Sequence, residues 1–198
     1  MQIIFATGNQ GKLREIRAIL AQDHAEVISM KEAGFEGDIE ENGTTFEENA
    51  LIKARTIAKE TGTLTLADDS GLCIDALDGE PGIYSARYLG EDTPHSVKNP
   101  HILKRMENVP EEKRTARFVC ACAAVLPDGR EYVVRQTMEG HIAHEAAGEN
   151  GFGYDPIFYL PERGCTNAEL SSEEKNRISH RGKALRAMRD LLKQEGIL

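Results

Sequence analysis

Short apolar runs and amphipathic stretches alternate from the first residues of the chain. Residues 2–6 are apolar and β-prone, so they predict a buried first strand. A helix is predicted over residues 13–21, and its apolar face carries Leu13, Ile16, Ile19 and Leu20. Between them, Thr7–Lys12 contains two glycines and is typical of a turn. The chain is therefore expected to begin with a strand, a turn and a helix.

A second helix and strand follow the same pattern. Thr44 and Glu47 have the spacing of a capping box, and Gly62 is a typical helix end. The apolar stripe between them is Phe46, Ala50, Ala54, Ile57 and Ala58. Residues 63–67 then predict a strand that ends at an acidic turn, Asp68–Gly71. In open α/β sheets, ligands gather at the carboxyl ends of the strands.

The second half of the chain combines loops with a hairpin. Residues 79–100 are rich in glycine, proline and charge, which favours a loop with a short helix, and residues 102–106 continue a helical segment. Strands are predicted over residues 117–126 and 131–138. The turn at 127–130 joins them into a β-hairpin.

The last predicted helix follows a capping box of Ser171 and Glu174 and ends near Gln194. Its core face would carry Ile178, Leu185, Met188 and Leu192. Strands and helices are mixed along the chain, and the hairpin adds an antiparallel pair. The pattern predicts an α/β fold with a mixed sheet and flanking helices.

Composition narrows the class of partner. The chain has 24 Lys and Arg against 33 Asp and Glu, a formal net charge of −9. A protein that binds duplex nucleic acid normally carries a basic excess, so nucleic acid is disfavoured as a partner. A small anionic ligand remains compatible, because local basic groups and a divalent cation can hold it.

The apolar stretches, the N-terminus and the cysteine spacing indicate the cellular compartment. No stretch approaches the roughly 20 apolar residues that a membrane span requires, and the N-terminus does not resemble a signal peptide. The four cysteines form no Cys-x-x-Cys pair, which favours apolar packing in a reducing compartment over zinc or disulfides. Cys120 and Cys122 are expected to point the same way from a strand. We therefore expect a cytoplasmic protein with no membrane partner.

The turn Thr7–Lys12 suits a phosphate. Its glycines permit close approach, the helix that follows offers free N–H groups, and Lys12 adds a positive charge. An ordinary strand–helix turn would have the same residues. The spacing excludes a Walker A loop, because two residues rather than four separate Gly8 from Gly11.

The acidic turn suits a magnesium ion. Asp68 and Asp69 repel each other unless a cation or partner offsets them, and magnesium prefers carboxylates together with substrate phosphates. Solvated carboxylates in a simple turn are the alternative. The acidic stretch 38–42 offers a second ligand, or only a solvated face. Lys53 lies close to the apolar stripe of its helix.

Two later segments suit a nucleobase. In the glycine-rich stretch 151–156, Phe152 could stack on a base and Asp155 could accept its N–H groups. His180 and Arg181 could donate to the O6 of a hypoxanthine or xanthine ring, which adenine lacks. The alternatives are an aromatic-anchored loop and a basic helix face.

Six motifs together resemble the non-canonical purine NTP pyrophosphatases, also called inosine triphosphate pyrophosphatases. They are Thr7-Gly8-Asn9-x-x-Lys12, Phe46-x-Glu48-Asn49-Ala50-x-x-Lys53-Ala54, Ala67-Asp68-Asp69-Ser70-Gly71-Leu72, Pro81-Gly82-Ile83-Tyr84-Ser85-Ala86-Arg87-Tyr88, Gly151-Phe152-Gly153-Tyr154-Asp155-Pro156 and Ser179-His180-Arg181. They occur in family order over nearly the whole chain. The resemblance implies magnesium-dependent hydrolysis of ITP, dITP and XTP to the monophosphate and pyrophosphate, which keeps these nucleotides out of nucleic acids. It also implies an elongated α/β fold, a single domain over 1–198 with two lobes around a central nucleotide-binding cleft, and a homodimer.

The resemblance also implies roles for residues. Asp69 would be the metal ligand and proton acceptor, and Glu41 a second metal ligand with Glu40 the near alternative, whereas the role of Asp68 stays open. The implied substrate contacts are Thr7, Gly8, Asn9, Gln10, Gly11, Lys12, Lys53, Ser70, Phe152, Gly153, Tyr154, Asp155, Lys175, His180 and Arg181.

The sequence departs from the family pattern in two places. Two prolines in 93–101 are expected to disturb a helix start, and Ala146-Ala147 replaces a common Pro-Arg pair. Neither is expected to touch the proposed chemistry. The rival functions are a pyrophosphatase for modified pyrimidine or other damaged nucleotides and a nucleotide-binding module without catalysis.

Overall fold

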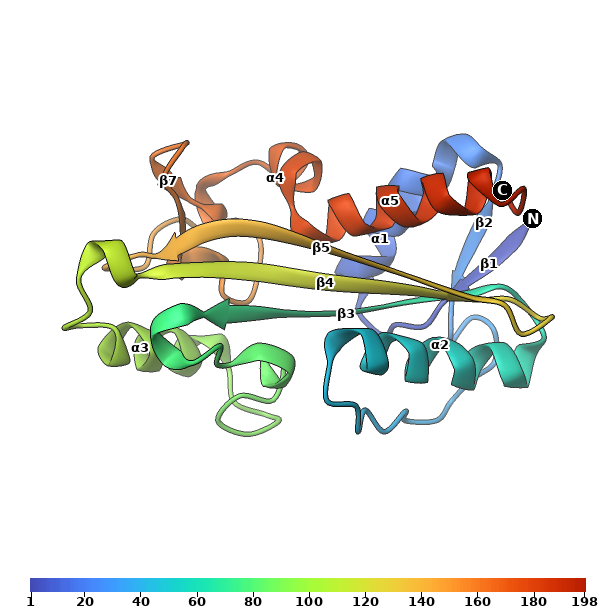
Figure 1. Cartoon of the computed structure of the whole chain (residues 1–198), viewed down its shortest axis with the longest axis horizontal. Helices are drawn as coiled ribbons and strands as arrows, with labels where there is room; N and C mark the ends of the chain where they lie inside the picture. The colour runs from blue at the N-terminus through green and yellow to red at the C-terminus, as the bar shows by residue number, and fades with distance from the viewer. The chain divides into compact units, whose positions relative to one another are not determined.

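The computed structural model describes the backbone of residues 1–198 and every side chain except that of Gln22. Its strands form one sheet in the order β2-β1-β3-β4-β5-β6-β7 (Figure 1). The strands are β1 (Gln2–Phe5), β2 (Glu26–Ser29), β3 (Thr65–Ile74), β4 (Thr115–Val125), β5 (Glu131–Ile142), β6 (Phe158–Leu160) and β7 (Cys165–Thr166). β1 runs parallel to β2 and β3, whereas β6 is antiparallel to β5 and β7. The predicted α/β fold with a mixed sheet is confirmed.

Five α-helices accompany the described strands. They are α1 (Gln10–Leu20), α2 (Phe46–Thr61), α3 (His95–Arg105), α4 (Ser172–Ile178) and α5 (His180–Gln194). α1 begins three residues before its predicted start, because the Asn9 side chain accepts hydrogen bonds from the N–H groups of Gly11 and Lys12. α2 is capped by Thr45, whose side chain accepts from the Glu48 N–H, and not by the predicted Thr44. No helix among the described residues is both long and apolar enough to cross a membrane.

The chain divides into two compact units. The first comprises residues 1–69, 120–136 and 180–198, and the second comprises residues 70–119 and 137–179. In the first unit, α1 and α5 pack on one face of β1 and β3, while α2 lies on the other (Figure 1). The core beneath α1 and α5 includes Ile3, Phe5, Leu13, Ile16, Leu66, Cys120, Cys122, Leu185 and Met188. Cys120 and Cys122 therefore share one face, as predicted.

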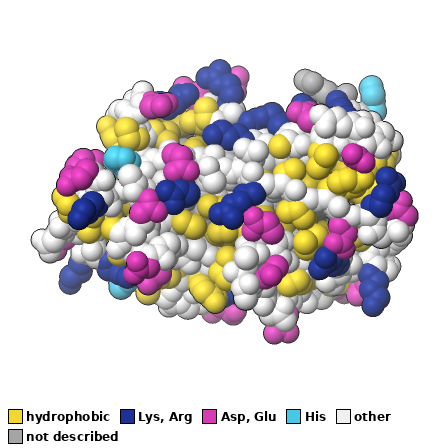
Figure 2. Space-filling view, viewed as in Figure 1, with side chains coloured by type: hydrophobic (Ala, Val, Ile, Leu, Met, Phe, Trp, Pro, Cys, Tyr) yellow, Lys and Arg dark blue, Asp and Glu magenta, His cyan; other side chains and the backbone are white. Residues whose placement is uncertain are grey.

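The second unit has its own apolar core, formed by the distal parts of β3, β4 and β5 together with α3 and the segments around β6. Its buried residues include Leu72, Ile74, Ile102, Met106, Phe118, Met138, Tyr154 and Phe158. On the face drawn in Figure 2, acidic and basic side chains are interspersed with apolar ones.

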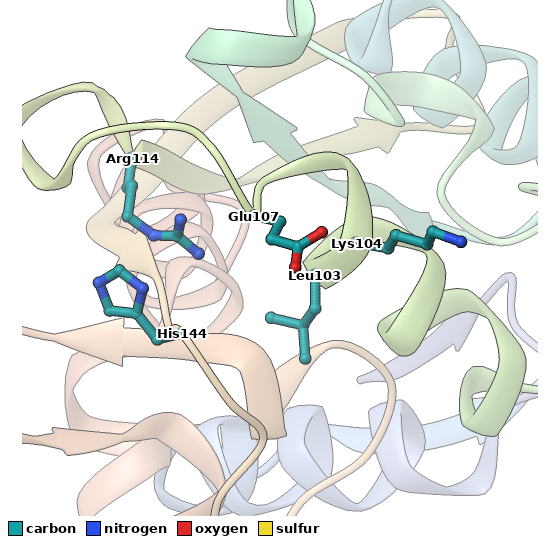
Figure 3. A pocket seen from close by; sticks show the side chains of 5 residues that line it. All are labelled: Leu103, Lys104, Glu107, Arg114 and His144. Carbon is teal, nitrogen blue, oxygen red and sulfur yellow. The ribbon is translucent and has the colours of Figure 1, made fainter.

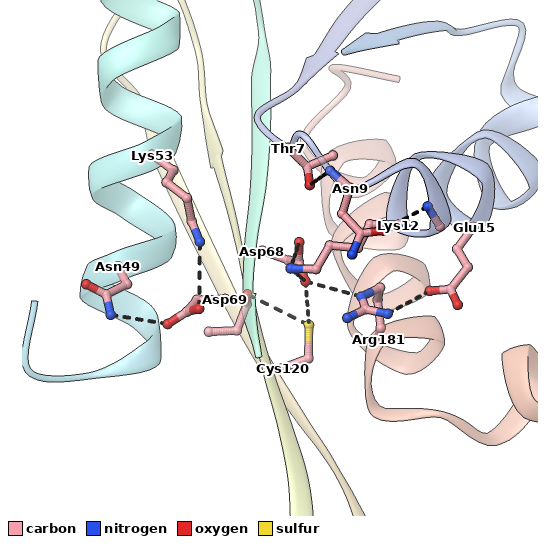
Figure 4. Close-up of polar contacts among 12 residues, drawn as sticks. Thr7, Asn9, Lys12, Glu15, Asn49, Lys53, Asp68, Asp69, Cys120 and Arg181 are labelled. Carbon is pink, nitrogen blue, oxygen red and sulfur yellow. Dashed lines mark hydrogen bonds and ion pairs between the residues drawn. The ribbon is translucent and has the colours of Figure 1, made fainter. Parts of the chain in front are cut away.

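The predicted acidic turn is wrong, because β3 continues through it. Asp68–Gly71 lies inside the strand Thr65–Ile74. Aspartate, serine and glycine disfavour strands, but β3 lies between β1 and β4 in the sheet, and this pairing overrides local preference. Successive side chains of a strand point to opposite faces, so the Asp68 and Asp69 side chains are separated rather than paired (Figure 4).

Three other elements differ from the sequence prediction. The last predicted helix is broken at Ser179, where the backbone is extended with a ψ of 151°. Ile178, before the break, packs against the core of the second unit, whereas α5, after the break, contributes to the core of the first unit. The prolines of 93–101 do not prevent a helix start, because Pro94 occupies the N-cap of α3. Pro100 lies inside the same helix. β2 was not expected. The hairpin is confirmed, with Leu126 and Arg130 closing the connection between β4 and β5.

Candidate active site

The first group of predicted site residues surrounds Asp68 in the first unit. Asp68 is only 1% exposed, and its Oδ1 accepts a hydrogen bond from Lys12 Nζ at 3.0 Å. Its Oδ2 accepts from Arg181 Nε at 3.2 Å. Arg181, at the start of α5, also donates to Glu15 on α1 at 3.1 Å (Figure 4). Two carboxylates and two cations are thereby joined within one buried network.

The charge of Asp68 is fixed by this network. Burial alone would raise the pKa of the carboxyl, but the positive charges of Lys12, Arg181 and Lys53 outweigh burial and lower the pKa below its usual range. Burial would lower the pKa of Arg181, yet Asp68 and Glu15 raise it. Asp68 is thus an ionised anchor for Lys12 and Arg181, which is a role that the sequence left open.

A second group lies across β3, toward α2. Lys53 Nζ is 2.8 Å from Glu41 Oε2 and 3.6 Å from Asp69 Oδ1. Asn49, one turn earlier on α2, donates its Nδ2 hydrogen to Asp69 Oδ2 at 3.2 Å (Figure 4). The helix therefore presents an amide and an ammonium to Asp69, and it draws the acidic loop in through Glu41.

Asp69 lies in a different electrostatic setting from its neighbour Asp68. Burial raises the pKa of the Asp69 carboxyl, and the nearby charge of Glu41 adds to this against the opposing effect of Lys53. Burial would lower the pKa of Lys53, but Asp69, Asp68 and Glu41 raise it. Adjacent residues on one strand therefore carry carboxyl groups whose pKa values shift in opposite directions, a pattern typical of functional sites.

The donor set at Asp69 suits magnesium. Glu41 and Asp69 offer carboxylate oxygens around one ammonium, and magnesium binds through one or two carboxylates plus phosphates and water. Among the side chains that the structure describes, no group of three or more His, Cys, Asp or Glu could hold a metal ion. A magnesium ion here would take its remaining ligands from substrate and solvent.

The strand-to-helix corner of the first unit shows why the phosphate turn forms. Thr7 lies two residues after the end of β1, is 8% exposed, and accepts the Asn9 N–H on its Oγ1 at 3.1 Å. Asn9 then caps α1. Gly8, Asn9 and Gln10 are exposed at this corner, and Gly11 and Lys12 belong to the first turn of α1.

The third group lies in the second unit, in the glycine-rich stretch 151–155, which we call the base loop. Asp155 is 3% exposed, and its oxygens accept from Phe152 N at 2.8 Å, Asn167 Nδ2 at 2.6 Å and Lys175 Nζ at 2.7 Å. Lys175 Nζ also lies 4.3 Å from the centroid of the Phe152 ring. Asp155 therefore ties the loop together, whereas the ring of Phe152 is 48% exposed.

Backbone freedom is required at the start of the base loop. Gly151 has a φ of 74°, and a Cβ there would lie 2.2 Å from Asp155 Oδ2. Further along, Tyr154 is buried and donates its hydroxyl hydrogen to Ser85 O at 2.7 Å. The loop's shape therefore depends on contacts on both sides of its exposed phenyl ring.

The segment 93–101, which was expected not to touch the proposed chemistry, contacts the base loop. Asn99 Nδ2 donates to Gly153 O at 3.0 Å. The rings of His95 and Tyr154 meet edge to face, with centroids 4.7 Å apart. These contacts join residues more than fifty positions apart, which a local sequence pattern cannot reveal.

The remaining predicted residues are placed as follows. Ser70 is half-buried on β3, and His180 is buried as the first residue of α5. Sequence reasoning missed Glu15, Asn49 and Asn167 as partners of the predicted residues. Asn49 carried a usable signal, because it is a polar residue beside the apolar stripe of a helix and buried amides need partners.

A cavity of about 420 Å³ in the second unit contains none of the predicted site residues. It is lined by Leu103, Lys104, Glu107, Arg114 and His144 (Figure 3). Arg114 is 1% exposed and donates to the carbonyl oxygens of Met106, Val109, Ile142 and Ala143. Its contacts hold the α3–β4 connection against the end of β5, which is a structural role.

Known proteins resemble this chain in sequence and in fold over nearly its whole length. The Ham1 family profile matches residues 3–191. The dITP/XTP pyrophosphatase of Bacillus licheniformis is 49% identical over 193 residues, which cover 98% of each chain. Solved Ham1 proteins of Staphylococcus aureus and Coxiella burnetii superpose with TM-scores of 0.90 and 0.91, each 42% identical, covering 98% of this chain and 100% and 99% of theirs. Because the profile spans almost every element described above, and relatives match from end to end, the chain belongs to the Ham1 family.

Proposed function

We propose that this chain hydrolyses non-canonical purine nucleoside triphosphates, namely dITP, ITP and XTP, to the monophosphate and pyrophosphate. The six sequence motifs support this reaction, and so does the activity for which the Bacillus licheniformis relative is named, dITP/XTP pyrophosphatase. The observation that carries it is the Lys53 ammonium between the Glu41 and Asp69 carboxylates. A site that only bound a nucleotide would not need two carboxylates beside a triphosphate, because like charges repel.

Magnesium is the cofactor that the carboxylates fit, with Asp69 and Glu41 as its protein ligands. When bound, it would neutralise phosphate charge and polarise the scissile anhydride. Glu41 rather than Glu40 is the ligand that we assign, because Glu41 contacts Lys53 while the Glu40 side chain is exposed.

Lys12 and the start of α1 are suited to the phosphates. The first N–H groups of a helix carry a partial positive charge, and Lys12 adds a full one in the first turn. Asp68 orients the Lys12 ammonium rather than contacting substrate. Lys53 would offset the charge that builds on the leaving pyrophosphate, as positioned cations do in phosphoryl transfer.

Asp69 is the residue that we assign to accept the proton of the attacking water. Asn49 and Lys53 hold its carboxylate from two sides, which fixes the oxygens relative to β3. A positioned proton acceptor contributes roughly 10²–10⁴-fold to such a step. The adjacent Ser70 is assigned a substrate contact.

The base loop supplies purine recognition in this proposal. The exposed Phe152 ring offers a stacking face, and Lys175 over that ring adds a donor close to it. Asp155 acts through the loop, because protein donors already occupy its oxygens.

His180 and Arg181 stay assigned to the nucleotide, with Arg181 acting from within the Asp68 network. We further infer a homodimer, which light scattering on the purified chain would test.

A substrate panel tests the reaction. Pyrophosphate release is measured with ITP, dITP, XTP, GTP and dUTP, with and without EDTA. The proposal expects release from the first three in magnesium and none in EDTA. Faster release from dUTP would favour a pyrimidine enzyme, and tight ITP binding without release would favour a binding module.

A further inference from the structure

Two residues from the first two turns of α3, His95 and Asn99, contact the base loop. Asn99, 7% exposed, donates its amide hydrogen to Gly153 O, the central carbonyl of the loop. His95, one turn earlier, lies over the same residue, because a Cβ on Gly153 would be 3.6 Å from the His95 Nε2 atom. One helix face therefore contacts the loop at two adjacent residues, Gly153 and Tyr154.

This helix face is itself fixed in place. Lys98 is 1% exposed, and its Nζ donates to Ala86 O at 2.5 Å. The neighbouring Ser85 accepts the Tyr154 hydroxyl on its carbonyl and the Leu72 N–H on its Oγ. The contacts form a closed circuit from α3 through the 85–86 segment and Tyr154 back to His95.

The amides around the loop are not arranged for stability alone. Asn99 and Asn167 each donate one hydrogen bond to the loop, and each leaves a buried Oδ1 without a hydrogen-bond partner among the described groups. An unsatisfied buried acceptor is unfavourable, and apolar replacement of such groups often costs little. Their presence is better explained by the donor that each provides to the loop.

We propose that Asn99 and His95 are positioning residues that set where the base loop presents Phe152 to the purine ring. This inference rests on the proposed function, and it adds α3 to the parts that decide base selectivity. Neither side chain contacts the carboxylates or lysines of the first unit in the contacts described above. Their loss should therefore weaken recognition of the base and leave the hydrolytic step intact.

The test measures KM and kcat for ITP and GTP in Asn99→Ala and His95→Ala. KM for ITP is expected to rise about fivefold to tenfold, the effect of one lost hydrogen bond, with kcat within about twofold of wild type. The preference for ITP over GTP should fall. His95→Phe keeps the edge-to-face ring contact and should restore the wild-type KM. Asn99→Asp keeps the shape but places an acceptor against Gly153 O, so its effect should exceed that of Asn99→Ala.

Hydrogen exchange of the amides at 152–155 supplies a readout independent of activity. Exchange should be faster in Asn99→Ala and His95→Ala than in Val97→Ala, a control at an exposed position of the same helix. If KM, selectivity and exchange of the two variants match those of the control, the inference is overturned. If wild type does not hydrolyse ITP, the proposed function fails, while the exchange rates still decide whether α3 positions the loop.

Discussion

Lys12 Nζ lies 3.0 Å from Asp68 Oδ1, which connects the first turn of α1 to the middle of β3. Asp68 is 1% exposed and also holds Arg181, so one carboxylate serves two cations. Removing one partner of a buried ion pair leaves uncompensated charge, which is strongly destabilising. The structure therefore gives Asp68 a different duty from the neighbouring Asp69, although the two residues are adjacent and identical.

Asp68→Asn is expected to lower the free energy of unfolding by about 3–5 kcal/mol, because Lys12 and Arg181 lose their shared anion. Urea unfolding of the variant and of wild type measures the difference. Asp75→Asn is the matched control, since Asp75 is a half-exposed partner of Arg117, and exposed pairs contribute less than about 1 kcal/mol. Equal losses in the two variants would contradict the anchoring role of Asp68.

Asp69→Asn should lower turnover without lowering the free energy of unfolding, in contrast to Asp68→Asn. Turnover of ITP with magnesium is expected to fall at least about a hundredfold, because the proton acceptor is lost. Stability should stay the same or rise, because burial and Glu41 disfavour the ionised Asp69 side chain in the fold. Steady-state kinetics and urea unfolding on one preparation provide both numbers. Turnover near the wild-type rate would remove Asp69 from the centre of the mechanism.

The contrast between these aspartates shows what the sequence could and could not predict. The pairing of apolar runs with glycine-containing boundaries predicted β1, α2 with its end at Gly62, and the β4–β5 hairpin. It failed at Asp68–Gly71, because residues with turn preference sit in the middle of a sheet, where strand pairing decides the conformation. Because successive side chains of a strand point to opposite faces of the sheet, the Asp68 and Asp69 carboxylates lie on opposite faces of β3.

The candidate site was predictable where local chemistry carries the signal and not where tertiary contacts do. The acidic stretch 38–42 and Lys53 were noted from the residues alone, the family resemblance added Glu41, and the structure brings Lys53 and Glu41 to 2.8 Å. Asn99 and Asn167 were not, because their partners lie 54 and 12 residues away and no local pattern marks a buried amide donor. Asp155 was read as a direct base contact, but three protein donors occupy its oxygens.

The second metal ligand is tested by a matched pair of substitutions. Glu41→Gln should raise the magnesium concentration that gives half-maximal ITP turnover, because it removes one of two carboxylate ligands. Glu40→Gln, in an exposed neighbour, should leave that concentration unchanged. Magnesium titrations of the rate distinguish the two. A larger effect from Glu40→Gln would assign the ligand to Glu40.

Asp75 is expected to contribute to the pH dependence of the free energy of unfolding. Hydrogen bonds from Arg117 and then Thr115 lower the pKa of its carboxyl from the ordinary value of 3.8. A lowered folded pKa stabilises the protein above the unfolded value, and this contribution is lost as pH falls through the folded pKa. Asp75→Asn should therefore be less stable than wild type at pH 6, by less than about 1 kcal/mol because the pair is half exposed. The two proteins should converge below pH 3.8, which urea unfolding across that range would measure; a difference that grew on acidification would contradict the sign.

The base loop can also be disturbed without removing any of its hydrogen-bonding side chains. Gly151→Ala introduces a Cβ that would lie 2.2 Å from Asp155 Oδ2 at a φ of 74°, so the loop must shift away from its anchor. KM for ITP is expected to rise about tenfold or more, because correct orientation of a bound group is worth that much. Gly129→Ala is the control, since Gly129 has a φ of 89° with no neighbour within 4 Å of the added atom.

Both alanine substitutions should cost stability, about 1–2 kcal/mol, because a left-handed backbone is unfavourable for any residue with a Cβ. Only Gly151→Ala should also change KM, because Gly129 belongs to the β4–β5 turn and contacts no base-loop residue among the hydrogen bonds described above. Kinetics and urea unfolding on both variants separate strain from position. A KM change in Gly129→Ala equal to that in Gly151→Ala would mean that lost stability, and not the position of Phe152, explains the weaker recognition.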